Sequence, residues 1–178
     1  MTFPVFASGD VLNASDMNAV GLWLVKTQTI GTAVSSVTVT GAFSADYDNY
    51  KVLISGGAGS TGGAISLQLG STTTGYYRSI NSVLWNGTHS VSAQSNAASF
   101  GVAAWMETNH IVMNFDIINP FATKNTIVIG GVPQANAGGA GLFYMGYLAD
   151  STSYTAFTIS SGANTMTGGT IRVYGYRN

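Results

Sequence analysis

From Leu22 onward, apolar and polar residues alternate in short runs along the chain. A period of two, with many Val, Ile, Thr and aromatic residues, is typical of half-buried β-strands. Gly, Asn and Ser residues separate the runs, and Asn86-Gly87 is a strong hairpin signal. The pattern predicts strands over 23–30, 33–40, 50–55, 64–69, 76–80, 82–85, 99–106, 110–118, 126–130, 142–148, 154–160 and 170–176.

So many short strands, with no convincing helix after residue 22, predict an all-β fold: an antiparallel β-sandwich or jelly roll over residues 23–178. No repeat of fixed period is present, which disfavours a solenoid or propeller. The glycine-rich segments 56–63 and 135–141 are predicted to be hairpin loops. Neither has the Lys-Ser/Thr or the strand-to-helix context of a phosphate-binding loop.

Residues 1–22 have a different pattern and are predicted to form a separate attachment element. The first nine residues, with Pro4 and Gly9, indicate an extended arm, and residues 14–20 indicate a short helix with a cap at Asn13 or Ser15. A helix of one or two turns is marginal alone, so we expect it to dock on a neighbour. The candidate docking side chains are apolar: Phe3, Phe6, Leu12, Met17 and Val20.

The composition narrows the function. Only 7% of the 178 residues are charged, against about 25% in an average domain. A net charge of −1 gives no basic surface for nucleic acid, and no run of about 18 apolar residues predicts a membrane span. The chain has no cysteine, and its first ten residues do not resemble a secretion signal. Low charge favours association, so we expect a surface that packs against copies of itself; a neutral monomer is the alternative.

Few residues offer catalytic or metal chemistry, so we predict no catalytic residue, no metal and no cofactor. His89 follows a hairpin signal and His110 opens a strand, with no partner evident for either. Asp46 and Asp48 are predicted to lie in a turn before the strand at Tyr50, with a calcium site as the alternative. An enzyme would need a pair of acids in a cleft, for example Glu107 or Asp116 with another acid.

Aromatic residues near turns are the candidates for ligand binding. Trp85 directly precedes Asn86-Gly87, and Tyr76 and Tyr77 follow a polar, glycine-containing segment. Adjacent strand residues point to opposite faces, so one of the two tyrosines is expected inside and the other outside. The alternative is that all three cap the ends of the core. Trp23 and Trp105, which have apolar neighbours, are expected in the core.

Three passages resemble structural proteins of tailed bacteriophage virions. Residues 6–18, Phe-Ala-Ser-Gly-Asp-Val-Leu-Asn-Ala-Ser-Asp-Met-Asn, are similar to the opening of small tail-fibre, tail-tip and head-decorating proteins, with Asn13 in place of the commoner Thr. Residues 43–55 resemble the strand entry of their β-sandwich modules, with aromatic residues at Phe43, Tyr47 and Tyr50. Residues 169–178, Gly-Thr-Ile-Arg-Val-Tyr-Gly-Tyr-Arg-Asn, resemble their last strand.

The resemblance implies a non-enzymatic virion structural protein with a jelly-roll-like body. A tail-fibre or tail-associated module that assembles as a homotrimer and contacts the host surface is expected. The alternatives are a capsid decoration protein and a carbohydrate- or receptor-binding module. The implied partners are copies of itself, other virion proteins and a host-surface glycan or receptor, without nucleic acid or membrane insertion. The implied location is the virion, after synthesis in the host cytoplasm without a signal peptide.

Overall fold

The computed structural model describes residues 8, 9 and 21–176, and they form an all-β fold in which every strand pair is antiparallel. These residues contain no helix. The helix predicted over 14–20 and most of the predicted arm lie outside the described residues. The predicted all-β, antiparallel class is confirmed.

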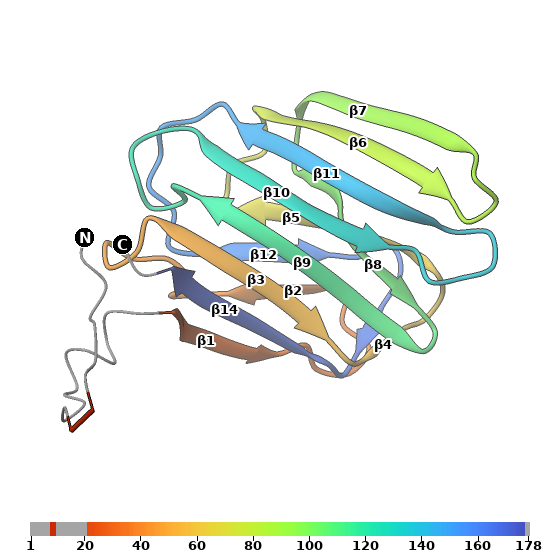
Figure 1. Cartoon of the computed structure of the whole chain (residues 1–178), viewed down its shortest axis with the longest axis horizontal. Helices are drawn as coiled ribbons and strands as arrows, with labels where there is room; N and C mark the ends of the chain where they lie inside the picture. Colours follow the sequence, from red (N-terminus) through yellow and green to blue (C-terminus); the bar gives the residue numbers. More distant parts are fainter. Residues whose placement is uncertain (1–7, 10–20, 177–178) are drawn as a thin grey trace.

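Twelve strands belong to one hydrogen-bonded sheet, which branches at β9 and is folded into two layers (Figure 1). The front layer has the order β1 (Leu22–Thr29), β14 (Thr170–Tyr176), β3 (Asn49–Ser55), β9 (His110–Ile118), β10 (Thr126–Pro133), β11 (Ala140–Leu148), β6 (Tyr76–Leu84) and β7 (His89–Ala97). The rear layer has the order β2 (Ser36–Val39), β12 (Phe157–Ser160), β5 (Gly63–Leu69) and β8 (Phe100–Glu107). Two short strands pair separately, β4 (Ala58–Gly59) and β13 (Met166–Thr167).

Strand β9 connects the layers. Near its C-terminal end it pairs with β10, from Ile118 to Phe115, whereas near its start it pairs with β8 through Val112 and Ile111. Its other edge pairs with β3. The β8–β9 hairpin therefore carries the chain from the rear layer to the front layer.

Side chains that point between the layers form one apolar core. On β3, for example, Tyr50, Val52 and Ile54 are buried and alternate with less buried residues. The largest side chains that are fully buried include six aromatic ones: Tyr50, Tyr76, Tyr144, Phe100, Phe115 and Phe157. The Tyr50 hydroxyl accepts a hydrogen bond from the Ser44 amide (2.8 Å), which satisfies its polar end inside the core.

Most predicted strands are present, with altered bounds. The predicted strands over 76–80 and 82–85 are one strand, β6. The strand predicted over 33–40 is confined to β2, because Ala33 has a φ of 53° and Val34 forms only an isolated bridge to Met166. Strand β12 begins at Phe157, three residues later than predicted. Strand β7, over residues 89–97, is not among the predicted strands.

The prediction for the glycine-rich segment 56–63 is wrong. A hairpin loop would connect neighbouring strands, but β3 pairs with β14 and β9 in the front layer, and β5 pairs with β12 and β8 in the rear layer. The segment crosses between the layers and carries β4. The hairpin loop predicted over 135–141 is confirmed with shifted bounds, since residues 134–139 join the paired strands β10 and β11.

The core prediction for Trp23 is also wrong. Trp23 lies on β1, the edge strand that pairs only with β14, and its side chain is 36% exposed. A strand with a neighbour on one side only shields its side chains less. Trp105 is partly buried and packs against the core from β8.

Candidate interaction surface

The outer face of the front layer carries an exposed apolar surface. On β11, Leu142, Tyr144 and Leu148 point into the core, whereas Phe143, Met145 and Tyr147 point to solvent. Neighbouring strands add exposed apolar residues in matching rows. We call this the outer apolar surface, formed by Val83, Val91, Ile127, Phe143, Met145 and Tyr147.

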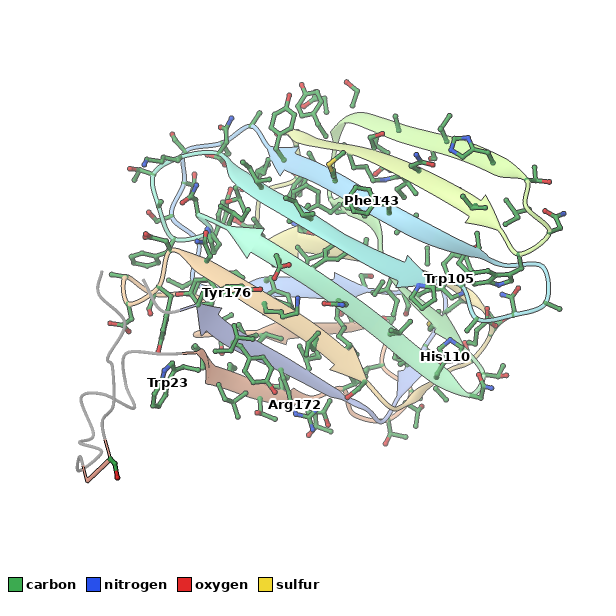
Figure 2. All side chains as sticks on the ribbon, in the orientation of Figure 1. Trp23, Trp105, His110, Phe143, Arg172 and Tyr176 are labelled. Carbon is green, nitrogen blue, oxygen red and sulfur yellow. The ribbon has the colours of Figure 1, made fainter. Side chains whose placement is uncertain are left out.

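Strand register places these residues side by side. Tyr147 lies opposite Ile127 on β10, and Phe143 and Val91 flank Asn81 of β6 from its two sides. Figure 2 shows Phe143 on β11, and its side chain is 53% exposed. Contiguous exposed apolar surface on a soluble protein marks an interaction site.

A groove of about 640 Å³ lies on one part of this face, lined in part by Tyr77, Ile127, Met145 and Tyr147. The rings of Tyr77 and Tyr147 are stacked, with centroids 4.9 Å apart and planes at 6°. The two stacked rings together form an aromatic wall of the groove. Tyr77 is therefore part of the candidate surface.

Tyr76 points the opposite way, so the expected alternation of Tyr76 and Tyr77 is confirmed. Tyr76 is fully buried, and its hydroxyl accepts a hydrogen bond from the Leu69 amide (2.8 Å) and donates one to the Thr72 carbonyl (3.2 Å). Burial raises the pKa of Tyr76 to about 12. A side chain so enclosed is part of the core, and a ligand role for it has no support in this geometry.

Trp85 is 55% exposed and connects two hairpin ends. Its indole Nε1 donates a hydrogen bond to the Gln134 carbonyl (3.1 Å), and its backbone amide donates one to Gly139 (3.1 Å). These contacts hold the β6–β7 turn against the loop between β10 and β11. A role in ligand binding stays a prediction for Trp85 and for Tyr77.

A polar cluster lies elsewhere on the same face. Lys51 Nζ lies 3.2 Å from Asp116 Oδ1. The hydroxyl of Tyr176, which is labelled in Figure 2, donates a hydrogen bond to the same carboxylate. Partial burial, together with this hydrogen bond, raises the pKa of Tyr176 to about 12. The two opposite charges offset each other, so the cluster adds little net charge to the face.

The hydrogen-bond partners of Glu107 and His110 are not acids. Glu107 accepts hydrogen bonds from Trp105 Nε1 (2.8 Å) and from Asn136, and these bonds lower its pKa. His110 Nδ1 lies 2.7 Å from the Asn109 side chain. His89 is exposed at the start of β7. No group of three or more metal-ligating side chains occurs among residues 8, 9 and 21–176.

The turn predicted around Asp46 is confirmed. The Ser44 hydroxyl donates a hydrogen bond to Asp46 Oδ2 (2.9 Å), and the Asp46 amide donates one back to Ser44 Oγ (3.3 Å). Hydrogen bonds of this local kind explain why an Asp occupies the turn, and they do not require a cation.

A second hollow, of about 310 Å³, opens between the layers where β8 faces β6 and β7. Trp105 and Val102 line it from the rear layer, and Ser82, Ser90 and Ser92 line it from the front layer. The Trp105 indole is oriented by its hydrogen bond to Glu107.

The proposed attachment side chains Phe3, Phe6, Leu12, Met17 and Val20 lie outside the described residues. Comparison with protein-family models, curated proteins and solved structures finds no match to the chain. Within the described part of the chain, no helix is long and apolar enough to cross a membrane.

Sequence reasoning missed the residues of the outer apolar surface on β11. The signal was present in Leu142-Phe-Tyr-Met-Gly-Tyr-Leu148, which is apolar at nearly every position and not only at every second one. In a strand, such a run places apolar side chains on both faces.

Proposed function

We propose that the protein is a non-enzymatic structural subunit of a bacteriophage virion, a tail-fibre or tail-associated module that assembles with copies of itself through the outer apolar surface. The two layers of this subunit form a β-sandwich of the jelly-roll type. The residues that precede β1 are its attachment element to other virion proteins. A homotrimer is the stoichiometry that the resemblance implies.

One observation carries the proposal: six large apolar side chains are exposed together on one sheet face, in a chain that is only 7% charged. Burial of apolar area stabilises association by about 25 cal/mol per Å² before ordering costs. The Lys51–Asp116 pair is the only salt bridge among the described residues, and its two opposite charges offset each other on the same face. The resemblance of residues 43–55 and 169–178 to virion proteins supports the biological setting.

A second candidate is a carbohydrate- or receptor-binding module, with Tyr77 and Trp85 as contact residues. The stacked Tyr77–Tyr147 pair beside the 640 Å³ groove favours it. A capsid decoration protein is the remaining alternative. Self-assembly and ligand binding differ in what they do to Tyr77, because assembly through the outer apolar surface covers it and a binding site leaves it accessible.

Multi-angle light scattering at micromolar concentration tests the proposal. We expect the wild-type protein to have a mass that is a multiple of 18.4 kDa. The double variant Phe143→Ser, Met145→Ser should lose the contact through the outer apolar surface and have a lower mass, with an unchanged circular dichroism spectrum. Leu24→Ser is the matched control, because Leu24 is as exposed as Phe143 but lies on β1, away from the outer apolar surface. A monomeric wild type contradicts self-assembly.

A further inference from the structure

Strand β7 is an open edge of the sheet that lacks most of the features that usually protect such an edge. It pairs with β6 on one side, and no strand among the described residues pairs with its other side. An unpaired edge is a template for another strand, and proteins usually protect it with charges, proline, short length or a bulge. The edge strand β1 has Lys26 and a register shift after Leu24, and the edge strand β2 has four residues.

Strand β7 lacks most of these protections. Its sequence, His-Ser-Val-Ser-Ala-Gln-Ser-Asn-Ala, has nine residues, no Lys, Arg, Asp or Glu and no proline. Most of its side chains are exposed, and Val91 is 72% exposed. An irregularity occurs only near its end, where the register with β6 shifts and Asn96 has a φ of 50°. The stretch from His89 to Ala93 is therefore regular, uncharged and open.

We propose that β7 pairs antiparallel with β7 of a second copy, about a two-fold axis at Val91, so that the front layers of the two copies form one continuous sheet. The inference rests on the proposed self-assembly and names a contact for it. The absence of charge favours an identical partner, because a two-fold contact brings each residue near its own copy and a charged strand would repel itself.

Hydrogen-bond alternation determines which residues of β7 face the open edge. The Leu84 amide donates to the Thr88 carbonyl (2.8 Å) across the β6–β7 turn. Along an antiparallel strand, every second residue directs its amide and carbonyl to the same neighbour. Ser90 and Ser92 therefore bond toward β6, and His89, Val91 and Ala93 direct their backbone groups to the open edge.

Symmetry selects the centre. A two-fold axis perpendicular to the sheet keeps each face on its own side, so opposed residues must belong to the same face. Of the centres that meet this requirement, Val91 is the one that pairs the whole regular stretch from His89 to Ala93, with Val91 opposite Val91 of the second copy and His89 opposite Ala93 of the second copy. The pairing brings the Val91 side chain, the most exposed of the outer apolar surface, beside its own copy and joins the two outer apolar surfaces along one line.

Disulfide trapping tests the register directly, because the natural chain has no cysteine. Opposed residues in a hydrogen-bonded pair have Cα atoms about 5.5 Å apart, which suits a disulfide. Val91→Cys should form a disulfide-linked dimer on mild oxidation. Thr27→Cys, at an exposed position on the β1 edge, is the control. We expect about ten-fold more dimer from Val91→Cys, because pairing holds the two thiols at high effective concentration.

Ala93→Pro tests the backbone pairing separately. Its lost amide faces the open edge, so β6–β7 pairing survives and the circular dichroism spectrum stays unchanged. This variant should lose the two-fold contact, with the mass by light scattering halved. A variant that keeps the wild-type mass contradicts pairing through β7.

The remaining outcomes separate the two proposals. A two-fold contact gives an even number of copies: a dimer, or a hexamer if three-fold contacts through the outer apolar surface are added. A wild-type trimer overturns the β7 pairing and leaves self-assembly standing. The same conclusion follows if, in a mixture of the two cysteine variants, Val91→Cys forms disulfides only with Thr27→Cys, because β7 would then pair with β1 of the second copy. A wild-type monomer overturns both. An oligomer that resists Phe143→Ser, Met145→Ser but is trapped by the Val91→Cys disulfide supports β7 and contradicts the outer apolar surface as the contact.

Discussion

Val102 adopts a backbone conformation that a β-branched residue rarely occupies. Its φ is 60°, in the left-handed region, and it lies in β8 where the register with β5 shifts. Ile65 faces Ala104 and Leu67 faces Phe100, so one residue of β5 faces three of β8. Such a bulge bends the strand and re-aims a side chain, here Val102 at the hollow between the layers. The left-handed conformation costs about 1–2 kcal/mol for a residue with a Cβ.

Glycine substitution at Val102 should therefore change the free energy of unfolding less than glycine substitution at the neighbouring Ala103. Ala103→Gly loses a buried methyl group and makes the unfolded chain more flexible, so we expect it to lower the free energy of unfolding by about 1.5–2 kcal/mol. Val102→Gly relieves the left-handed strain, which offsets its lost packing, so the change should stay within about 1 kcal/mol. Urea unfolding of both variants measures the difference. Equal losses at the two positions would mean that Val102 is unstrained.

Single positions were predictable from the sequence where alternation alone decides burial. The opposite orientations of Tyr76 and Tyr77 follow from the pleat of one strand. Trp23 shows the limit, because its exposure depends on β1 being an edge, and edges are set by pairing between distant segments. The strain at Val102 depends likewise on β5, which begins far away in the sequence.

At the scale of single elements, the two adjacent glycines of β10 have different roles. Gly130 lies opposite Phe115 of β9, and a Cβ atom there would overlap the Phe115 ring and the Asn114 carbonyl oxygen. A Cβ atom at Gly131 would lie 3.4 Å from the Leu142 carbonyl oxygen, at ordinary contact distance. Neither glycine has a positive φ, so space is the difference between them.

Alanine substitution separates these roles. Gly130→Ala should lower the free energy of unfolding by about 3 kcal/mol, because the backbone of β9 cannot yield as a flexible side chain would. Gly131→Ala should be neutral or raise stability by up to about 1 kcal/mol, since alanine reduces the entropy of the unfolded chain. Thermal unfolding followed by circular dichroism compares the two. If Gly130→Ala is tolerated as well as Gly131→Ala, the close packing of β9 against β10 is wrong.

The bounds of strands were predictable where apolar residues alternate with polar ones along the sequence. The strands with Val, Ile and aromatic residues in alternation, such as β3 and β9, have nearly the predicted bounds. Strand β7 was missed because its Ser, Asn, Gln and Ala residues give almost no apolar period. It is a strand because β6 supplies a partner across the Asn86-Gly87 turn, where Gly87 has a φ of 87°. The same polar composition leaves its outer edge open.

At the scale of the whole molecule, the sequence predicts the class of fold but not which strands share a layer. The crossing of segment 56–63 between layers, and the sharing of β9 by β8 and β10, are products of long-range pairing. That pairing also creates the outer apolar surface, because Phe143 and Val91 come together only through β6. The candidate surface therefore depends on the three-dimensional pairing, although the nearly continuous apolar run of β11 indicates one of its strands.

Among the described residues, the two-layer body begins with β1. Strand β1 pairs with β14 from Leu22 opposite Tyr176 to Thr29 opposite Thr170. No hydrogen bond of the body involves a residue before Leu22 among those described. We therefore expect deletion of residues 1–20 to change the melting temperature by less than about 2 °C, which corresponds to under about 1 kcal/mol for a chain of this size.

Deletion of residues 1–29 is the matched comparison, because it also removes β1. Val25 packs against the core from this strand, and β14 would become an unprotected edge. We expect this longer deletion to lower the melting temperature by at least about 5 °C. Calorimetry measures both variants. If the shorter deletion unfolds the protein, residues 1–20 belong to the folded body. If it melts normally but no longer joins virions, while the full chain does, those residues act in attachment because the body they leave behind is intact.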